Sequence, residues 1–332
     1  MITANIRAVM RAGLAAIVVL GIATSASHAQ SDPAVSYPNK PIKLIVGFAP
    51  GGGTDIVARI IGQKLQELLG QSVVIENKPG AGGLVAGAYV AGQPADGYTL
   101  LYGASGGLAI SPAINSKTPY KTTKDFVPIA MLGGYNLMMV VHPDHPAKSV
   151  REFVAWAKAN PDQVNYGAAS PAFVLATELF KLKTGSPGTQ IPFKGSSETI
   201  ISLLGKQVTF AIIDLPPAIE HVRSGKLRAL AMTSPTRVAD FPDVPTMTEA
   251  GAPDVNVRLW SGLFAPAGTP PAIVKKLETV SIQSIGFADV KDKLRAVAVN
   301  TIGMPSAKFI PAIDEEIKMW TEIAKATNLK FE

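Results

Sequence analysis

KLIVGFAPGGGTDIVARIIGQKL, residues 43–65, is the stretch that decides the fold. The apolar run over 42–48 is typical of a buried strand, and the apolar spacing over 54–69 is typical of an amphipathic helix. Glycines form the turn between them. The free N–H groups at a helix start, with a dipole of roughly half a positive charge, favour an anion. The sequence therefore predicts an anion site at this turn.

The spacing of this turn is close to that of a nucleotide-binding P-loop. Gly47, Gly52 and Thr54 match the pattern, but Gly53 stands where the phosphate-binding lysine would be. Nucleotide hydrolysis is therefore disfavoured, and a plain turn without a ligand is the other alternative. The glycines let a ligand approach the backbone closely, and Thr54 can cap the helix. Asp55 suits the helix dipole and can cap or orient the loop.

The same strand, turn and helix order recurs along the chain, which predicts doubly wound α/β layers. Further turns follow predicted strands at 77–83, 103–107, 167–171 and 212–217. In open α/β sheets, ligands bind at the carboxyl ends of strands. These turns therefore add candidate binding residues to those of the glycine turn within residues 43–65.

The strand-helix alternation begins afresh after residue 140, which predicts two lobes, each a sheet flanked by helices. We expect the chain to cross between them in extended segments near 137–141 and 257–264, which would form a hinge with a cleft. Lobe 1 would hold residues 37–138 plus 262–332, and lobe 2 residues 139–261. The tail is predicted to hold three helices without strands of their own, at 271–286, 288–297 and 306–327.

The first 29 residues have the order of a secretory signal peptide. Arg7 and Arg11 precede an apolar run over 12–23, and small residues, Ser27 and Ala29, suit a cleavage site before Gln30. The run is shorter than the roughly 20 residues that cross a membrane, so a retained anchor is the weaker alternative. We therefore predict export, with no membrane insertion after cleavage.

Composition argues against several classes of function. The chain has no cysteine, and its 31 Lys and Arg against 25 Asp and Glu give a formal net charge of +6 without a basic block. Disulfides and thiolate chemistry are excluded, and nucleic-acid binding is not indicated. His142 and His145 lie in a proline-rich stretch without a third ligand, so we expect no metal. No nucleophile has an evident base partner, so we expect no catalytic residue, no cofactor and no enzymatic activity.

Short motifs occur along nearly the whole chain after residue 37. They are YPNKPI (37–42), PGGGTD (50–55), ENKPGAGG (76–83), DGYTLL (96–101), GKLRALAMTS (225–234), PDVPTMTEAG (242–251) and GLFAPAGTP (262–270). In kind and order they resemble the motifs of the Bug-type, TctC-like solute-binding proteins of tripartite tricarboxylate transporters.

The resemblance implies a two-lobed periplasmic binding protein of Venus-flytrap form. Such a monomer closes on a small organic acid and delivers it, by transient contact, to membrane transporter subunits. The ligand would be held mainly by backbone groups and ordered waters from loops of both lobes. The ligand-binding residues that we expect are Phe48, Gly51, Gly52, Gly53, Thr54, Asp55, Ser105, Gly106, Ala169, Ser170, Phe173 and Asp214.

The stretch GAASPAFVLATELF, residues 167–180, departs from the family pattern. The loop is shorter, and Val174 stands where the family often has a histidine. A less polar rim suits an apolar body behind the carboxylate, and Phe48 and Phe173 offer faces to a ring. We therefore favour an aromatic carboxylate or dicarboxylate. An aliphatic di- or tricarboxylate is the alternative, as is a role as ligand-sensing partner of a periplasmic sensor domain.

Overall fold

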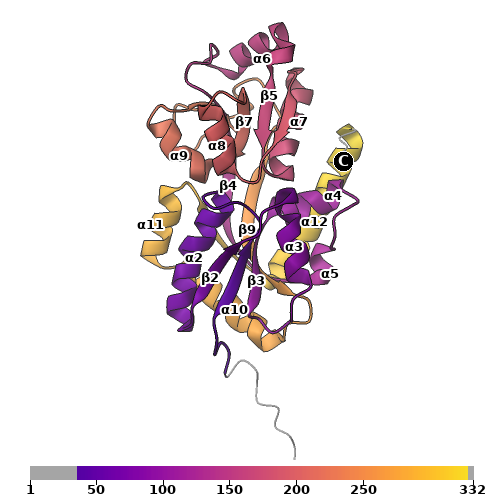
Figure 1. Ribbon diagram of the computed structural model, residues 1–332, viewed down its shortest axis with the longest axis vertical. Coiled ribbons are helices and arrows are strands. Elements are labelled where there is room, and N and C mark those ends of the chain that lie inside the picture. The colour runs from indigo at the N-terminus through magenta and orange to yellow at the C-terminus, as the bar shows by residue number, and fades with distance from the viewer. Residues whose placement is uncertain (1–35, 328–332) are drawn as a thin grey trace, which may run out of the picture.

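Two lobes lie one above the other along the long axis of the computed structural model, and strands β4 and β9 run between them (Figure 1). The structure describes residues 36–327, so the predicted signal segment lies outside the described part. Strands pair in the order β2-β1-β3-β9-β4-β7-β5-β6, and β8 and β10 also pair with β4. The predicted α/β class with two lobes is confirmed.

The lower lobe of Figure 1 is lobe 1. Its strands are β1 (Ile42–Val46), β2 (Val73–Asn77), β3 (Thr99–Ala104), β9 (Arg258–Pro266) and β10 (Asn300–Pro305). Its helices are α2 (Gly53–Leu69), α3 (Leu84–Ala91), α4 (Ser111–Ile114), α5 (Thr122–Asp125), α10 (Pro271–Ser284), α11 (Ala288–Ala296) and α12 (Ser306–Thr327), with short turns η1 (Ala81–Gly83) and η2 (Gly106–Ile110).

Lobe 2 holds β5 (Asn165–Ala168), β6 (Thr189–Pro192), β7 (Phe210–Asp214) and β8 (Arg228–Met232). Its helices are α6 (Val150–Ala159), α7 (Pro171–Thr184), α8 (Ser196–Leu204) and α9 (Leu215–Arg223), with a short turn η3 (Pro161–Gln163).

The opening stretch folds as its periodicity predicts. β1 pairs in parallel with β2 and β3, as parallel strands joined by helical crossovers do. On α2 the apolar residues Val57, Ile61 and Leu65 are buried, at spacings of one helical turn. Gly70 caps the end of the helix with a left-handed φ of 67°, a conformation that glycine adopts without strain. This packing fixes the start of α2 at the carboxyl end of β1.

One long strand, β4 (Phe126–Val141), belongs to both sheets. Its residues up to Asn136 pair with β9, and from Leu137 onward it pairs with β7. The predicted crossing near 137–141 is thus the last part of a longer strand, and the second crossing leads into β9. The lobe boundaries at 138 and 262 stay a prediction.

The predicted absence of strands from the tail is wrong. β10 lies between α11 and α12 and pairs antiparallel with β4. Its register shifts between Thr301 and Met304, and Gly303 has a φ of 68°. This short strand is bulged, starts exposed and contains Gly303 and Pro305, so its sequence carries little strand signal.

Candidate functional site

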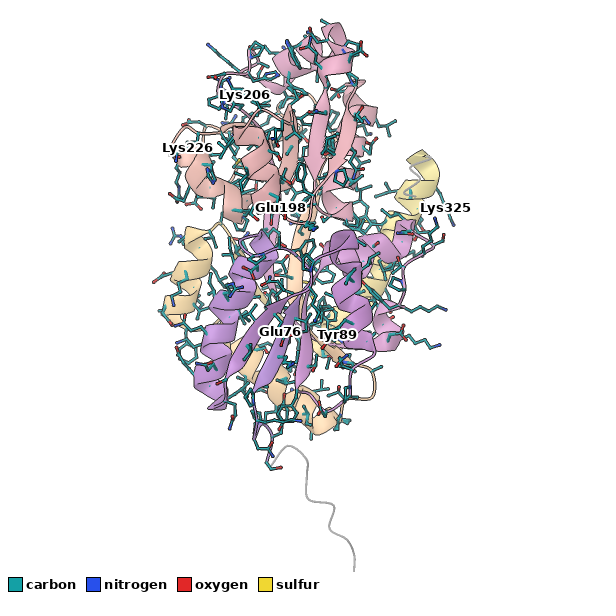
Figure 2. All side chains as sticks on the ribbon, in the orientation of Figure 1. Glu76, Tyr89, Glu198, Lys206, Lys226 and Lys325 are labelled. Carbon is teal, nitrogen blue, oxygen red and sulfur yellow. The ribbon has the colours of Figure 1, made fainter. Side chains whose placement is uncertain are left out.

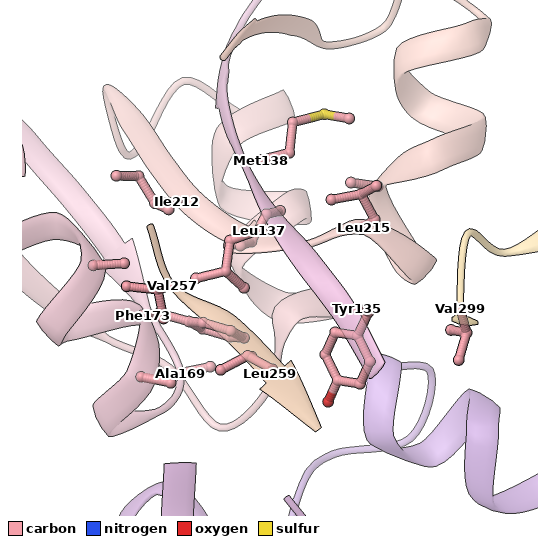
Figure 3. Close-up of a cluster of buried hydrophobic side chains, with 14 of the residues drawn as sticks. Tyr135, Leu137, Met138, Ala169, Phe173, Ile212, Leu215, Val257, Leu259 and Val299 are labelled. Carbon is pink, nitrogen blue, oxygen red and sulfur yellow. The ribbon is translucent and has the colours of Figure 1, made fainter. Parts of the chain in front are cut away.

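A small cavity lies where the two lobes meet, lined by residues of both. Figure 3 shows the apolar part of this junction, where Phe173 and Leu259 approach Tyr135 beside β4 and β9. The cavity measures about 10 Å³, which is roughly the room for one water molecule. Its lining residues are Phe48, Gly52, Gly53, Thr54, Ala104, Gly106, Tyr135, Ser170, Phe173, Ser196, Asp214 and Leu259. We call it the inner cavity.

Four helices begin at the inner cavity. α2 starts at Gly53 and α8 at Ser196, while Ser170 and Asp214 hold the N-cap positions of α7 and α9. The starts of α2 and α8 present N–H groups that have no acceptor within their own helix, and every start carries a partial positive charge. α7 opens with Pro171, and α9 has Pro216 and Pro217 in its first turn, so these two starts offer fewer N–H groups. The lining includes no Lys, Arg or His. Attraction for an anion here therefore comes from helix starts and not from basic side chains.

Direct hydrogen bonds hold the lobes closed around this cavity. The Ala49 N–H donates to the Lys194 carbonyl over 3.2 Å, and the Ser197 hydroxyl donates to the Pro50 carbonyl over 3.1 Å. Within lobe 2, Glu198 accepts the Lys194 N–H over 3.0 Å and so steadies the loop that carries the Lys194 carbonyl; Figure 2 places Glu198 near the boundary between the lobes. The loop before α2 is thus fastened to the start of α8.

Asp214 makes a further hydrogen bond between the lobes. The Gly53 N–H donates to Asp214 Oδ2 over 2.9 Å, and the Ser196 hydroxyl donates to Oδ1. The Asp214 side chain is buried. Burial raises the pKa of Asp214 to about 6, although the hydrogen bonds from Ser196 and Gly53 lower it in part. A protein carboxylate therefore occupies the helix start at which the sequence predicts an anion.

Asp55 faces away from the inner cavity and holds the glycine turn in place. Its Oδ2 accepts the Gly51 N–H over 2.9 Å and Arg59 Nε over 2.8 Å, while Oδ1 accepts Asn77 Nδ2 over 2.8 Å. Burial favours a higher pKa for Asp55, but the bonds from Arg59, Asn77 and Gly51 outweigh burial and lower it. The orienting role considered for Asp55 fits this geometry.

The structure brings eight of the twelve predicted residues together around the inner cavity: Phe48, Gly52, Gly53, Thr54, Gly106, Ser170, Phe173 and Asp214. Gly51, Asp55, Ser105 and Ala169 do not line it. Ser105 is buried, and its hydroxyl accepts the backbone N–H of Trp260 over 3.4 Å. Whether any of the twelve contacts a ligand stays a prediction.

Four lining residues were missing from the sequence prediction: Ala104, Tyr135, Ser196 and Leu259. Ser196 had a usable signal, because it follows Gly195 and directly precedes the amphipathic run over 197–204. Tyr135 and Leu259 had none, since their approach depends on how β4 and β9 pass between the lobes.

A wider cavity of about 610 Å³ adjoins the inner one, and Ser170 lines both. We call it the outer cavity. Its lobe 1 side includes Ala81, Gly82, Leu84, Ser111, Ile114 and Asn115, and its lobe 2 side includes Ala168, Ala169, Pro171, Val174, Glu178, Gln190, Pro192 and Phe193. The Ser111 hydroxyl is buried and has no hydrogen-bond partner. Glu178 accepts hydrogen bonds from Tyr166 and Lys181. The outer cavity therefore has a mixed polar and apolar lining, and its carboxylate, Glu178, is already engaged by Tyr166 and Lys181.

Within residues 36–327, no cluster of acidic residues and histidines is arranged to hold a metal ion. Over the same residues, no helix combines the length and the apolar character needed to cross a bilayer.

Comparison with known proteins identifies the family. Residues 57–329 match the model of the tripartite tricarboxylate transporter family receptor. The chain belongs to this receptor family. Its members are periplasmic solute-binding proteins, so the resemblance drawn from the short motifs is confirmed.

Relatives cover nearly the whole length of the receptor. Protein BugT of Bordetella pertussis is 37% identical over 321 residues, which are 96% of this chain and 98% of BugT. A structure of MatC from Rhodopseudomonas palustris with bound malate has a TM-score of 0.83 at 31% identity and covers 86% of this chain and 99% of that one. A structure of Rpa4515 from the same organism with adipate has a TM-score of 0.85 at 32% identity and covers 89% and 99%.

Proposed function

We propose that this receptor captures a small organic carboxylate between its lobes and presents it to the membrane subunits of a tripartite tricarboxylate-type transporter. The observation that carries the proposal is the convergence of four helix starts, without any basic side chain, on one cavity at the lobe junction. Such a place favours a carboxylate. The serines in the lining have no histidine or lysine there to activate them as nucleophiles. We therefore also propose that the protein is not an enzyme.

The two adjoining cavities suggest how such a ligand lies. Its carboxylate would occupy the inner cavity, and its body would extend past Ser170 into the outer cavity. A ligand that contacts both lobes binds the closed form better than the open form, and this difference drives closure. The inner cavity would have to widen slightly to admit a carboxylate, since about 10 Å³ is smaller than that group.

Two ligand classes have support. Phe48 and Phe173 line the inner cavity, and Phe193 lines the outer one, which favours an aromatic carboxylate or dicarboxylate. Malate in MatC and adipate in Rpa4515 favour an aliphatic dicarboxylate instead. The outer cavity offers Ser111, Asn115 and Gln190 as neutral partners for a second polar group of either class.

A thermal-shift screen separates the two classes. The panel contains malate, adipate and succinate against benzoate, phthalate and terephthalate, each at matched ionic strength. A ligand at about 100 times its dissociation constant adds about 2.7 kcal/mol to stability. Saturable shifts with the aromatic acids alone would support the first class, and shifts with the short diacids alone would refute it. If no acid shifts the melting temperature even after unfolding and refolding to remove carried-over ligand, the carboxylate proposal fails.

We further propose that the receptor works in the periplasm as a monomer after removal of residues 1–29. The charged, apolar and small-residue order of that segment supports export, and the family is periplasmic. Intact-mass measurement of periplasmic protein tests the cleavage, and a mass that retains residues 1–29 would contradict it.

A further inference from the structure

Asp214 occupies the position that we assign to the carboxylate of the ligand. Its Oδ2 lies 2.9 Å from the Gly53 nitrogen, so the first N–H of α2 already has an anionic acceptor. Asp214 comes from lobe 2 and α2 from lobe 1, so this contact exists only when the lobes are closed. The inner cavity keeps only about 10 Å³ beside it. An external carboxylate therefore meets a carboxylate of the protein at the same helix start.

The groups around Asp214 supply no positive side chain. Tyr135 of β4 faces it, and the pKa of Tyr135 is raised by burial and then by the negative charge of Asp214. On α2, Asp55 is engaged by Arg59 and Asn77 instead. The remaining facing side chains are neutral: Thr54 from α2, Ser170 and Phe173 from α7, Ser196 from α8, and Leu215 at the start of α9.

Two ionised carboxylates cannot share such an enclosed site at little cost. Like charges that lie close together in a buried place force one of the two groups to keep a proton. Helix starts can offset one negative charge, and Asp214 already uses this offset. A second carboxylate can enter if Asp214 gains a proton, which also turns Asp214 into a hydrogen-bond donor.

We propose that Asp214 is a built-in competitor for the ligand's carboxylate, and that an organic acid anion binds at the start of α2 together with one proton taken up by Asp214. This inference rests on the proposed carboxylate site. Asp214 is then a positioning and selectivity residue. It joins the closed lobes through Gly53, and it makes the affinity for an anion fall as rising pH removes the proton from Asp214.

The test uses sodium formate as the probe, because formate matches the group that the substitution Asp214→Ala deletes. Melting temperatures are measured against formate concentration at pH 6 and pH 8, with sodium chloride at the same ionic strength as reference. At pH 8 we expect half-saturation of Asp214→Ala at a formate concentration at least tenfold below that of the wild type. This gap should narrow at pH 6, since uptake of one proton changes the apparent affinity of the wild type by up to tenfold per pH unit.

Two further variants keep the test decisive. Asp214→Asn replaces Asp214→Ala in the test if the alanine variant does not fold. It retains the size of the side chain without its charge, so the formate concentration at half-saturation should be the same at pH 6 and pH 8. Glu316→Gln is the matched control. Glu316 is also a buried carboxylate with a raised pKa, but its partners are Trp260 and Trp320, outside the inner cavity. It should behave as the wild type.

Equal half-saturation of Asp214→Ala and wild type at pH 8 would overturn the competition. A gap that does not change between pH 6 and pH 8 would overturn the proton uptake. The result of this test is separate from that of the acid screen. If formate binds to Asp214→Ala but no larger acid raises the melting temperature of the wild type, the proposed function is refuted and the role assigned to Asp214 is retained.

Discussion

Gly53 leaves little room for a side chain at the inner cavity. A Cβ added at Gly53 would lie 2.0 Å from Asp214 Oδ2, whereas at Gly52 the nearest atom would be 3.4 Å away. We expect Gly53→Ala to weaken binding of the acid found in the screen at least tenfold, about 1.4 kcal/mol, because the lobes cannot close fully. Gly52→Ala, the matched control, should change it less than threefold. Calorimetric titration measures both, and equal affinities would contradict the placement of the site at Gly53.

The raised pKa of Asp214 predicts that the stability of the protein depends on pH. Its pKa is raised from 3.8 to about 6, so the folded protein binds this proton more tightly than the unfolded chain. Asp214 therefore stabilises the fold less as the pH rises from about 4 to about 6, and the loss is constant above that range. The free energy of unfolding of Asp214→Asn relative to the wild type should be larger at pH 8 than at pH 4.5, by up to about 2 kcal/mol. Urea unfolding at both pH values measures this, and a relative value that is smaller at pH 8 would contradict it.

The sequence could identify Gly53 and Asp214 as site residues because strand ends and glycine turns are visible in the pattern. It could not show that they bond to each other, since they lie 161 positions apart and meet only across closed lobes. Tyr135 was missed for a similar reason, since its place at the cavity depends on how β4 passes between the lobes.

At the scale of elements, Asp55 joins the glycine turn, α2 and β2. Asn77 of β2 donates to Asp55 and also to the Phe48 carbonyl over 2.9 Å, so one amide ties the turn to the next strand. Asp55→Ala should lower the free energy of unfolding by about 1–3 kcal/mol, because the Gly51 N–H and Asn77 lose a charged acceptor. Glu76→Gln, which removes only a partly exposed ion pair with Lys43, is the control and should cost under about 1 kcal/mol. Equal losses in urea unfolding would show that Asp55 does not hold the turn.

Elements with strong periodicity were predictable from the sequence. The two strands that connect the lobes, β4 and β9, were less predictable. The helix at 54–69 is α2 almost to the residue, because its buried face repeats every turn. The first part of β4 has Pro128, Gly133 and Gly134 in its sequence, which weaken any strand signal. Its length is set by pairing with β9, β10, β7 and β8, which is tertiary information.

For the whole molecule, closure can be tested with a disulfide across the lobes. A Cβ added at Gly51 would lie 3.8 Å from Ser197 Cβ, close to the roughly 3.8 Å typical of disulfides, and the chain has no other cysteine. Gly51→Cys combined with Ser197→Cys should form this bond, despite some strain from the φ of 79° at Gly51. The oxidised protein should stay compact in X-ray scattering and bind added acid at least tenfold more slowly, and reduction should restore the rate.

The Ser197→Cys single variant is the control for that experiment and should bind at the wild-type rate with or without reductant. An oxidised double variant that binds as fast as the reduced one would mean that ligand entry needs no opening of the lobes. The two-lobed arrangement itself was predictable from the repeated strand-helix order. The closed state with Asp214 on α2 was not, since a sequence pattern carries no information on the angle between lobes.

The most direct measurement of the central claim is amide chemical-shift mapping of the ¹⁵N-labelled receptor during titration with the acid that gives the largest thermal shift. A carboxylate at the converging helix starts should perturb the amides of Gly53, Thr54, Gly106 and Ser196 most strongly, since these residues line the inner cavity. Changes that leave these amides unaffected and cluster at the far side of the hinge, around Trp260 and Trp320, would contradict the claim.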